Sequence, residues 1–275
     1  MGFQTLPSSN DKGDRPWWLV AFVLIGVVLA TIIAVNDLYL QVFTVVGKGV
    51  FVTIFVTIVA FALATLLGLG IALLGLSNSL VLRQTARFYV EVIRGIPILV
   101  LLFYIAFVGA PGFVALYNLV ISPLVALGWL EPMVVRDLSL MWRAIIALMI
   151  GYSSFIAEIF RAGFQSVEKG QIEAAMSLGL NRTQRFRLIV FPQAIRVIFP
   201  PLSNDFISMV KDSSLVSVLG VADVTQMGKI YAAGSFRFFE TYSIVTYVYL
   251  VLTIGLSLVL RRLEMRMREH GSDGR

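Results

Sequence analysis

The chain has 275 residues, of which 58% are hydrophobic and 14% charged, and its formal net charge is +6. This composition is far more apolar than that of a soluble domain, and it indicates a membrane protein. The chain has no cysteine, one histidine (His270) and no glycine-rich phosphate-binding motif, so we expect no enzyme activity and no bound metal or cofactor.

The N-terminal region divides into three expected parts. Residues 1–16 are polar and turn-forming, and we expect a disordered cytoplasmic tail. The apolar run 17–35 is too long for the core of a signal peptide and is not followed by a small-residue cleavage pattern, so it predicts a retained transmembrane helix. Residues 36–49 would then form an outside loop.

Apolar runs further along predict an all-α, polytopic transmembrane bundle, because a hydrocarbon core about 30 Å thick requires about 20 helical residues. Segment 144–157 reaches that length only with Glu158 and its flanks. Segment 194–210 contains polar residues, which are tolerated against neighbouring helices or beside a wet cavity. Six spans are expected in all, at 17–35, 50–76, 95–130, 144–157 with flanks, 194–210 and 241–260.

The positions of lysine and arginine predict the orientation, since cytoplasmic loops carry the excess of these residues. Basic residues predominate after Leu76, in the connection 158–196 and in the tail 261–275, which are therefore expected inside. The segments 36–49, 131–143 and 211–240 are more balanced and are expected outside. Both termini would lie in the cytoplasm. The net charge is then a signal of topology and of contact with membrane lipid, and no nucleic-acid partner is expected.

A charged segment in the middle of the chain, "EAAMSLGLNRTQRFRLIVFP", has the signals of two helices joined by a bend. Residues 171–178 can form a short helix, Gly179 suits the left-handed position after it, and Asn181 with Gln184 resembles a capping box. We expect a bent helical pair that protrudes from the membrane, with a small apolar side that can dock into another protein. The alternative is an ordinary interfacial helix.

The spacing within this segment resembles a known signature. Glu173-Ala174-Ala175, three residues, Gly179, nine residues and then Ile189-x-Phe191-Pro192 match EAA-x3-G-x9-I-x-L-P, the motif of membrane subunits of bacterial ATP-binding-cassette importers, except for Phe191 in place of leucine. Further stretches, among them "YVEVIRGIPILVLLFY" and "FPQAIRVIFPPLSNDFISMVKDSSLVSVLG", resemble the polar amino-acid permease subfamily over about residues 50–262.

The resemblance implies the type I importer permease fold, with a core at 50–262, coupling helices at about 165–192 and a cytoplasmic tail at 263–275. It implies an inner-membrane subunit that imports a polar amino acid together with a second permease, two ATPase subunits that bind ATP and Mg, and an extracytoplasmic solute-binding protein. Glu173 would contact the ATPase, Gly179 would form the bend, and Ala174 and Ala175 would permit close approach. The span 17–35 is additional to the usual five-helix core.

Two other classes of function compete with this one. A secondary transporter driven by an ion gradient would also have several spans with buried carboxylates, but it has no reason for the EAA spacing. A membrane scaffold would explain the protruding helices but not a polar face through a span.

Helical spacing also indicates where a substrate could pass. A polar face in the span 194–212 is formed by Pro201, Asn204, Asp205, Ser208, Lys211 and Asp212, and a stripe in the span 141–162 by Ala147, Gly151, Ser154, Glu158 and Ala162. Such faces point toward the bundle interior or a cavity. For a zwitterionic amino acid, Glu158 and Asp205 are candidates to face the ammonium group, and Asn204, Ser154 and Ser208 are candidates to hydrogen-bond the carboxylate.

Structural roles compete with these assignments. Glu158 can pair with Arg161 three residues on, and Asp205 can pair with a nearby lysine or arginine. Glu91 and Arg94 are also expected to form a local ion pair. The weaker stripe Thr53, Thr57, Ala64 and Gly68 is expected to pack against another helix, as small residues commonly do in membranes.

Overall fold

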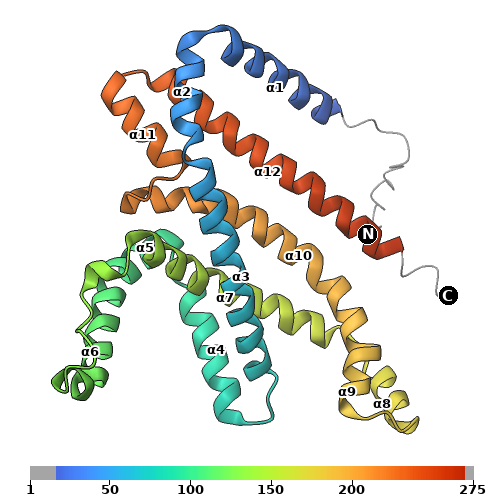
Figure 1. Ribbon diagram of the computed structural model, residues 1–275. Coiled ribbons are helices and arrows are strands. Elements are labelled where there is room, and N and C mark those ends of the chain that lie inside the picture. Colours follow the sequence, from blue (N-terminus) through green and yellow to red (C-terminus); the bar gives the residue numbers. More distant parts are fainter. Residues whose placement is uncertain (1–16, 270–275) are drawn as a thin grey trace, which may run out of the picture.

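The computed structural model describes residues 17–269, and every regular element within that range is helical (Figure 1). The first half of this range contains α1 (Trp17–Val35), α2 (Asp37–Gly47), α3 (Val50–Gly75), α4 (Leu80–Arg94), α5 (Ile98–Tyr104), the π-helical turn η1 (Ile105–Gly109), α6 (Ala110–Ala126) and the 3-10 turn η2 (Val135–Asp137). The expected tail 1–16 and the end of the tail 263–275 lie outside the described residues.

The second half begins with the long helix α7 and ends with the longer α12. Its elements are α7 (Leu140–Gln165), α8 (Lys169–Ser177), α9 (Arg182–Arg185), the π-helical turn η3 (Phe186–Val190), α10 (Phe191–Asp212), the 3-10 helix η4 (Ser213–Leu219), α11 (Val224–Ser235) and α12 (Phe238–Glu269). Residues 263–269 therefore continue α12 and do not form a separate tail.

Five helical segments in the described range are long and apolar enough to cross a membrane: Asp37–Gly75, Ile98–Ala126, Leu140–Gln165, Arg182–Leu219 and Phe238–Met267. They confirm five of the six expected spans. The remaining one corresponds to α1, a helix of 19 residues without a charged side chain, close to the about 20 residues that a crossing requires, and its role as a span stays a prediction. Residues 36–49, expected as a loop, contain α2, because the Asn36 side chain accepts a hydrogen bond from the Leu38 amide and starts a helix there.

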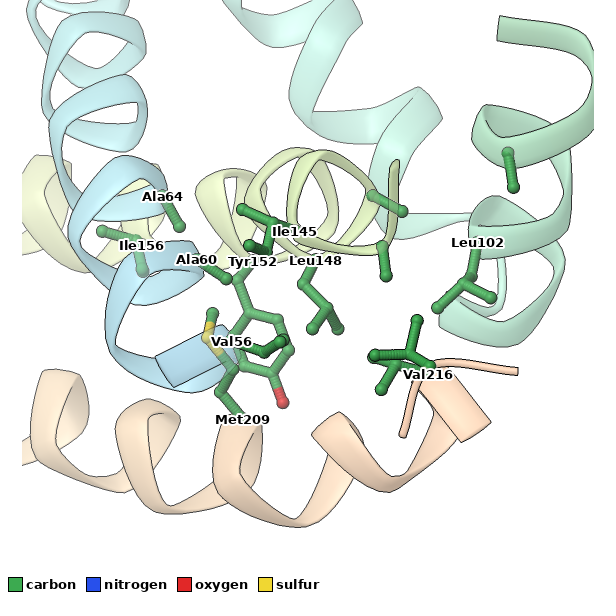
Figure 2. Close-up of a cluster of buried hydrophobic side chains, with 14 of the residues drawn as sticks. Val56, Ala60, Ala64, Leu102, Ile145, Leu148, Tyr152, Ile156, Met209 and Val216 are labelled. Atoms are coloured by element: carbon green, nitrogen blue, oxygen red, sulfur yellow. The ribbon is translucent and has the colours of Figure 1, made fainter. Parts of the chain in front are cut away.

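The core lies where α3 crosses α7 and is closed by α5, α10 and η4. Figure 2 shows Val56, Ala60 and Ala64 of α3 facing Ile145, Leu148, Tyr152 and Ile156 of α7, with Leu102, Met209 and Val216 around them. The alanines let the two backbones approach closely, as small residues do between membrane helices. At Gly68 the approach is closer still, since an added Cβ atom would lie 2.9 Å from the Ser153 carbonyl oxygen.

The stripe of Thr53, Thr57, Ala64 and Gly68 on α3 has the packing role expected of it. All four residues are buried, and the Thr57 hydroxyl donates to the Thr53 carbonyl at 2.8 Å. The Thr53 hydroxyl in turn accepts a hydrogen bond from the Val224 amide at 3.2 Å.

Arg143, near the start of α7, holds the outer part of the 98–126 segment in place. Its guanidinium donates to the carbonyls of Leu138 (2.8 Å), Ala106 (3.1 Å) and Val135, and the residue is only 8% exposed. Ala106 belongs to the π-helical turn η1, so this single side chain joins α7 to η1 and to η2. It fixes the place where α5 leads into α6.

At the end of α3 that faces α11, a buried carboxylate organises the chain. Asp223 is fully buried and caps α11, because its Oδ1 accepts from the Gln226 amide at 2.8 Å and its Oδ2 accepts from the Tyr249 hydroxyl at 3.1 Å. Burial raises the pKa of Asp223 above its ordinary value. The carboxylate thereby connects α11 to α12, next to Thr53 of α3.

Candidate functional site

The segment between α7 and α10 forms the bent helical pair expected from its sequence. Helix α8 ends with the Leu178 amide donating to the Ala174 carbonyl and the Leu180 amide donating to the Ala175 carbonyl. Gly179 has a φ of +75°, a conformation that side chains disfavour. Asn181 and Gln184 then exchange two capping hydrogen bonds of 2.9 Å, which start α9.

The buried and exposed side chains of α8 are not all the ones expected from the sequence. Ala175, expected to permit close approach of a partner, is only 1% exposed because it packs against its own chain. Glu173 and Ala174 are exposed, as are Met176 (55%) and Leu178 (80%). The surface that α8 offers to another protein therefore comprises Glu173, Ala174, Met176 and Leu178, which we call the α8 outer face.

Contacts on both sides tie this bent segment to the membrane helices. The Gln193 side chain of α10 donates to the Gln171 side-chain oxygen of α8 at 2.5 Å. Aromatic rings connect α7 to the start of α10, since Phe186 lies 6.1 Å from Phe164 and 6.0 Å from Phe191 between ring centroids. In Figure 1, α8 and α9 lie at one end of the molecule, beyond the core helices. The bent segment is thus attached to both α7 and α10.

A second candidate site is a hollow of about 500 Å³ between α7 and α10, closed by the last residue of α4. Its lining includes Arg94, Phe155, Glu158, Ile159, Ala162, Val197, Pro201 and Asp205. Two of the residues expected on the substrate route, Glu158 and Asp205, are thus brought together with an arginine.

The charged groups of this hollow differ in their partners. Glu158 forms a two-point ion pair with Arg161, with nitrogen–oxygen distances of 3.0 and 2.5 Å, so the structural pairing considered for it is present. Asp205 has a buried Oδ2 atom that makes no hydrogen bond within residues 17–269, and the pairing with a lysine or arginine considered for it is not found there. A carboxylate oxygen in this state is available to a ligand.

Arg94 was expected to pair with Glu91, and that prediction is wrong for the described residues. Its guanidinium instead lies over the Phe155 ring, 5.2 Å from the centroid, at the edge of the hollow. No local sequence signal identifies this placement, because it depends on how α4 packs against α7.

The three remaining candidates on the substrate route are placed differently from one another. Ser154 is fully buried and its hydroxyl donates to the Gly151 carbonyl at 2.7 Å, so it contributes to helix packing in this structure and does not line the hollow. Asn204 is exposed and Ser208 half-buried on α10. Neither is among the residues that line the hollow, and the next residues of α10, Met209 and Val210, are buried.

Comparisons with known proteins decide the family. Residues 64–269 match the family described as binding-protein-dependent transport system inner membrane component. The chain belongs to this family. The permease is 35% identical to the glutamine transport system permease protein GlnP of Escherichia coli, over 80% of this chain and 92% of the relative. It is 37% identical to the probable amino-acid permease protein YxeN of Bacillus subtilis, over 78% and 88%.

Solved structures agree with this assignment. The permease matches a chain of an amino acid ABC transporter crystallised with histidines, with 36% identity, a TM-score of 0.66 and coverage of 83% of this chain and 95% of that chain. An inward-facing form of the MetNI methionine ABC transporter matches in fold, with a TM-score of 0.61 at 18% identity.

The family and the structures together confirm the resemblance to type I importer permeases. The protein is a multi-pass inner-membrane component of a transport system, and nothing in the comparisons supports a secondary transporter. Its relatives are named as permease proteins, several of them of ABC transporters.

Proposed function

We propose that this permease is the membrane subunit of an ATP-driven importer of polar amino acids. Relatives over most of its length are named for the transport of glutamine and octopine, and the structure it matches at 36% identity is that of an amino acid ABC transporter. The permease itself hydrolyses no ATP. Two partner ATPase subunits bind ATP and Mg, a second permease completes the pathway, and an extracytoplasmic binding protein delivers the substrate.

The observation that carries this proposal is the charge arrangement of the hollow between α7 and α10. A zwitterionic amino acid needs an anion beside its ammonium group and a cation beside its carboxylate. Asp205 supplies a carboxylate oxygen without a hydrogen bond in the described chain, and Arg94 supplies a guanidinium at the same hollow. Asn204 and Ser208 lie near Asp205 on α10 and can add hydrogen bonds. Glu158, held by Arg161, contributes to the negative side of the hollow.

The bent segment at about 165–192 is proposed as the coupling element. Glu173 and Ala174 on the α8 outer face would contact an ATPase, Gly179 would form the bend, and the buried Ala175 would hold α8 on its own chain. Because α8 is tied to α10 through Gln171 and Gln193, closure of the ATPases on ATP would move the helix that carries Asp205. In this proposal α8, α9 and both termini lie in the cytoplasm.

Reconstitution tests the proposal. The permease is placed in liposomes with its partner permease, its ATPase and its binding protein, and uptake of a panel of labelled amino acids is measured with and without ATP. We expect ATP-dependent uptake of a polar amino acid. Uptake that follows an imposed ion gradient without ATP would overturn the ATP-driven importer.

Two variants test the hollow. Asp205→Asn is expected to lower uptake at least about tenfold, because a hydrogen bond to a charged group contributes about 1.5–3 kcal/mol. Asp37→Asn, at an exposed position on α2, is the matched control and is expected to leave uptake unchanged. Arg94→Gln should weaken uptake of the amino acid more than uptake of its amide, which lacks the carboxylate. Equal effects on both substrates would remove Arg94 from the site.

A further inference from the structure

A groove beside the core helices is lined by two membrane helices, α10 and α12. It lies between the first turns of α10 and the last turns of α12 and has a volume of about 580 Å³, within the range of about 300–1,000 Å³ typical of small-molecule sites. Its apolar wall is formed by Phe191, Ile195 and Phe199 of α10 and by Leu263 and Met267 of α12. The spacing of four residues along each helix aligns these side chains along the groove.

This apolar wall is suited to hydrocarbon. Phe191 is 49% exposed and Leu263 is 43% exposed, although both belong to segments that qualify as membrane spans. Apolar side chains that remain exposed along such a groove are compatible with an acyl chain lying against them, because lipid chains are as apolar as leucine.

The charge of the groove is entirely positive. Arg196 and Arg266 contribute to its lining, and no carboxylate does. Arg196 is exposed and makes no hydrogen bond or ion pair with the described residues. Arginine presents a planar pair of donors that matches phosphate oxygens, and basic pockets between membrane helices suit anionic lipid headgroups.

We propose that this groove binds one anionic phospholipid, with an acyl chain against Phe191, Ile195 and Phe199 and the phosphate held by Arg196 and Arg266. The bound lipid joins the first turns of α10 to α12. Those turns also carry Gln193, which is bonded to α8, so the lipid lies beside the part of the permease that receives motion from α8.

Native mass spectrometry of the purified transporter complex tests this proposal. The complex is titrated with dioleoyl phosphatidylglycerol and, separately, with dioleoyl phosphatidylcholine, which has the same chains and no net charge. We expect the anionic lipid to be retained at least about tenfold more strongly, since each basic residue near a lipid surface adds about fivefold. The double variant Arg196→Gln/Arg266→Gln should lose this preference.

The matched control uses two arginines of the same helix end that do not line the groove. Arg261→Gln/Arg262→Gln, both in α12, also removes two positive charges and is expected to keep the preference for the anionic lipid. Phe199→Trp, which fills the groove, should reduce binding of both lipids without changing the charge. Monodispersity on size exclusion establishes that each variant is folded.

Four results would overturn the proposal. Equal retention of the two lipids would show that charge is not recognised, and equal loss in both double variants would show general attraction to the surface. Displacement of the lipid by inorganic phosphate alone would make the ligand a free anion. Efficient cross-linking of cysteines introduced at Ile195 to the second permease, with no lipid retained, would make the groove a protein interface.

Discussion

At the scale of single residues, the buried carboxylate of Asp223 is the clearest case of a charge placed at a cost. It receives hydrogen bonds from the Gln226 amide and the Tyr249 hydroxyl, and no lysine or arginine forms an ion pair with it among the described residues. Burial without a cation disfavours the ionised form, which is why the pKa of Asp223 is raised.

The raised pKa predicts how stability depends on pH. The folded chain binds the Asp223 proton more tightly than the unfolded chain, in which the pKa has its ordinary value of about 3.9. The contribution of this group to stability is therefore fully present below about pH 3.9 and is lost as pH rises through the higher folded pKa. Asp223→Asn keeps the cap and removes the titration. We expect the midpoint temperature of wild type, relative to this variant, to fall as pH is raised from 3 to 8.

Thermal unfolding of the detergent-purified permease over that pH range is the measurement. Asp37→Asn, which alters an exposed carboxylate, should run parallel to wild type. Asp223→Ala, which loses the cap and leaves the Tyr249 hydroxyl without its acceptor, should be about 1–3 kcal/mol less stable at every pH. Parallel curves for wild type and Asp223→Asn would contradict the argument.

Residue positions within the candidate site were only partly predictable. Spacing alone placed both Asp205 and Ser154 on polar or small faces, but spacing does not reveal whether a hydroxyl bonds its own helix, as that of Ser154 does. For Arg94, local spacing predicts an ion pair with Glu91, which lies three residues before it. The alternative, a stack on Phe155 of α7, depends on packing between α4 and α7, which no local pattern encodes.

At the scale of elements, the crossing of α3 and α7 requires glycine at position 68. It does not require the glycine two residues later, at position 70. A Cβ atom added at Gly68 would lie 2.9 Å from the Ser153 carbonyl, which belongs to backbone and cannot move aside, whereas Gly70 has nothing within 4 Å. We expect Gly68→Ala to destabilise the permease by about 1–3 kcal/mol.

The control for that contact is Gly70→Ala on the same helix. It should be neutral or stabilising by about 0.5–1 kcal/mol, since alanine favours the helix. Both are measured by thermal unfolding in detergent. If the two substitutions shift the midpoint equally, close approach of the backbones is not what Gly68 provides.

Arg143 is a second residue that holds elements together, because its hydrogen bonds to backbone carbonyls join α7 to η1 and η2. Methionine at this position would fill similar space but leave the carbonyls of Leu138, Ala106 and Val135 without their donor. An unsatisfied buried acceptor costs about 1–3 kcal/mol. We expect Arg143→Met to cost at least about 2 kcal/mol, with Arg143→Lys in between because a single ammonium cannot reach all three.

Thermal unfolding again gives the comparison, with Arg136→Met as the control. Arg136 is exposed in η2, next to the same loop, so its loss should change stability by less than about 0.5 kcal/mol. Similar losses for Arg136→Met and Arg143→Met would mean that the carbonyl contacts do not matter.

The helices themselves were largely predictable, and the exceptions have identifiable causes. Long charge-free runs specify spans because a bilayer leaves few alternatives to a helix. The bend at Gly179 was predictable because a left-handed glycine and a capping pair are local signals. Helix α2 and the π-helical turn η1 were not predicted. The first follows from one cap at Asn36, and the second is accompanied by the distant Arg143, which bonds Ala106 within it.

At the scale of the whole molecule, the polar face of α10 and the bent segment are two ends of one mechanical unit. Asp205 lines the hollow between α7 and α10, and its neighbour Asn204 is exposed, so the polar face of α10 runs from that hollow to the surface of this chain. The same helix is bonded to α8 through Gln193. One continuous helix, α10, therefore connects the contact with α8 to the groups that are proposed to bind the substrate.

The α8 outer face gives a test of coupling that is separable from folding. Ala174 is exposed, whereas its neighbour Ala175 is buried on its own chain, so a larger side chain at Ala174 meets no part of the permease. We expect Ala174→Leu to leave the unfolding midpoint unchanged while reducing copurified ATPase and ATP-driven uptake at least about tenfold, a loss of about 1.4 kcal/mol in docking. Ala233→Leu, the same change at an exposed alanine of α11, should affect neither quantity. Full ATPase binding and uptake by Ala174→Leu would show that the α8 outer face is not where the energy of ATP enters the permease.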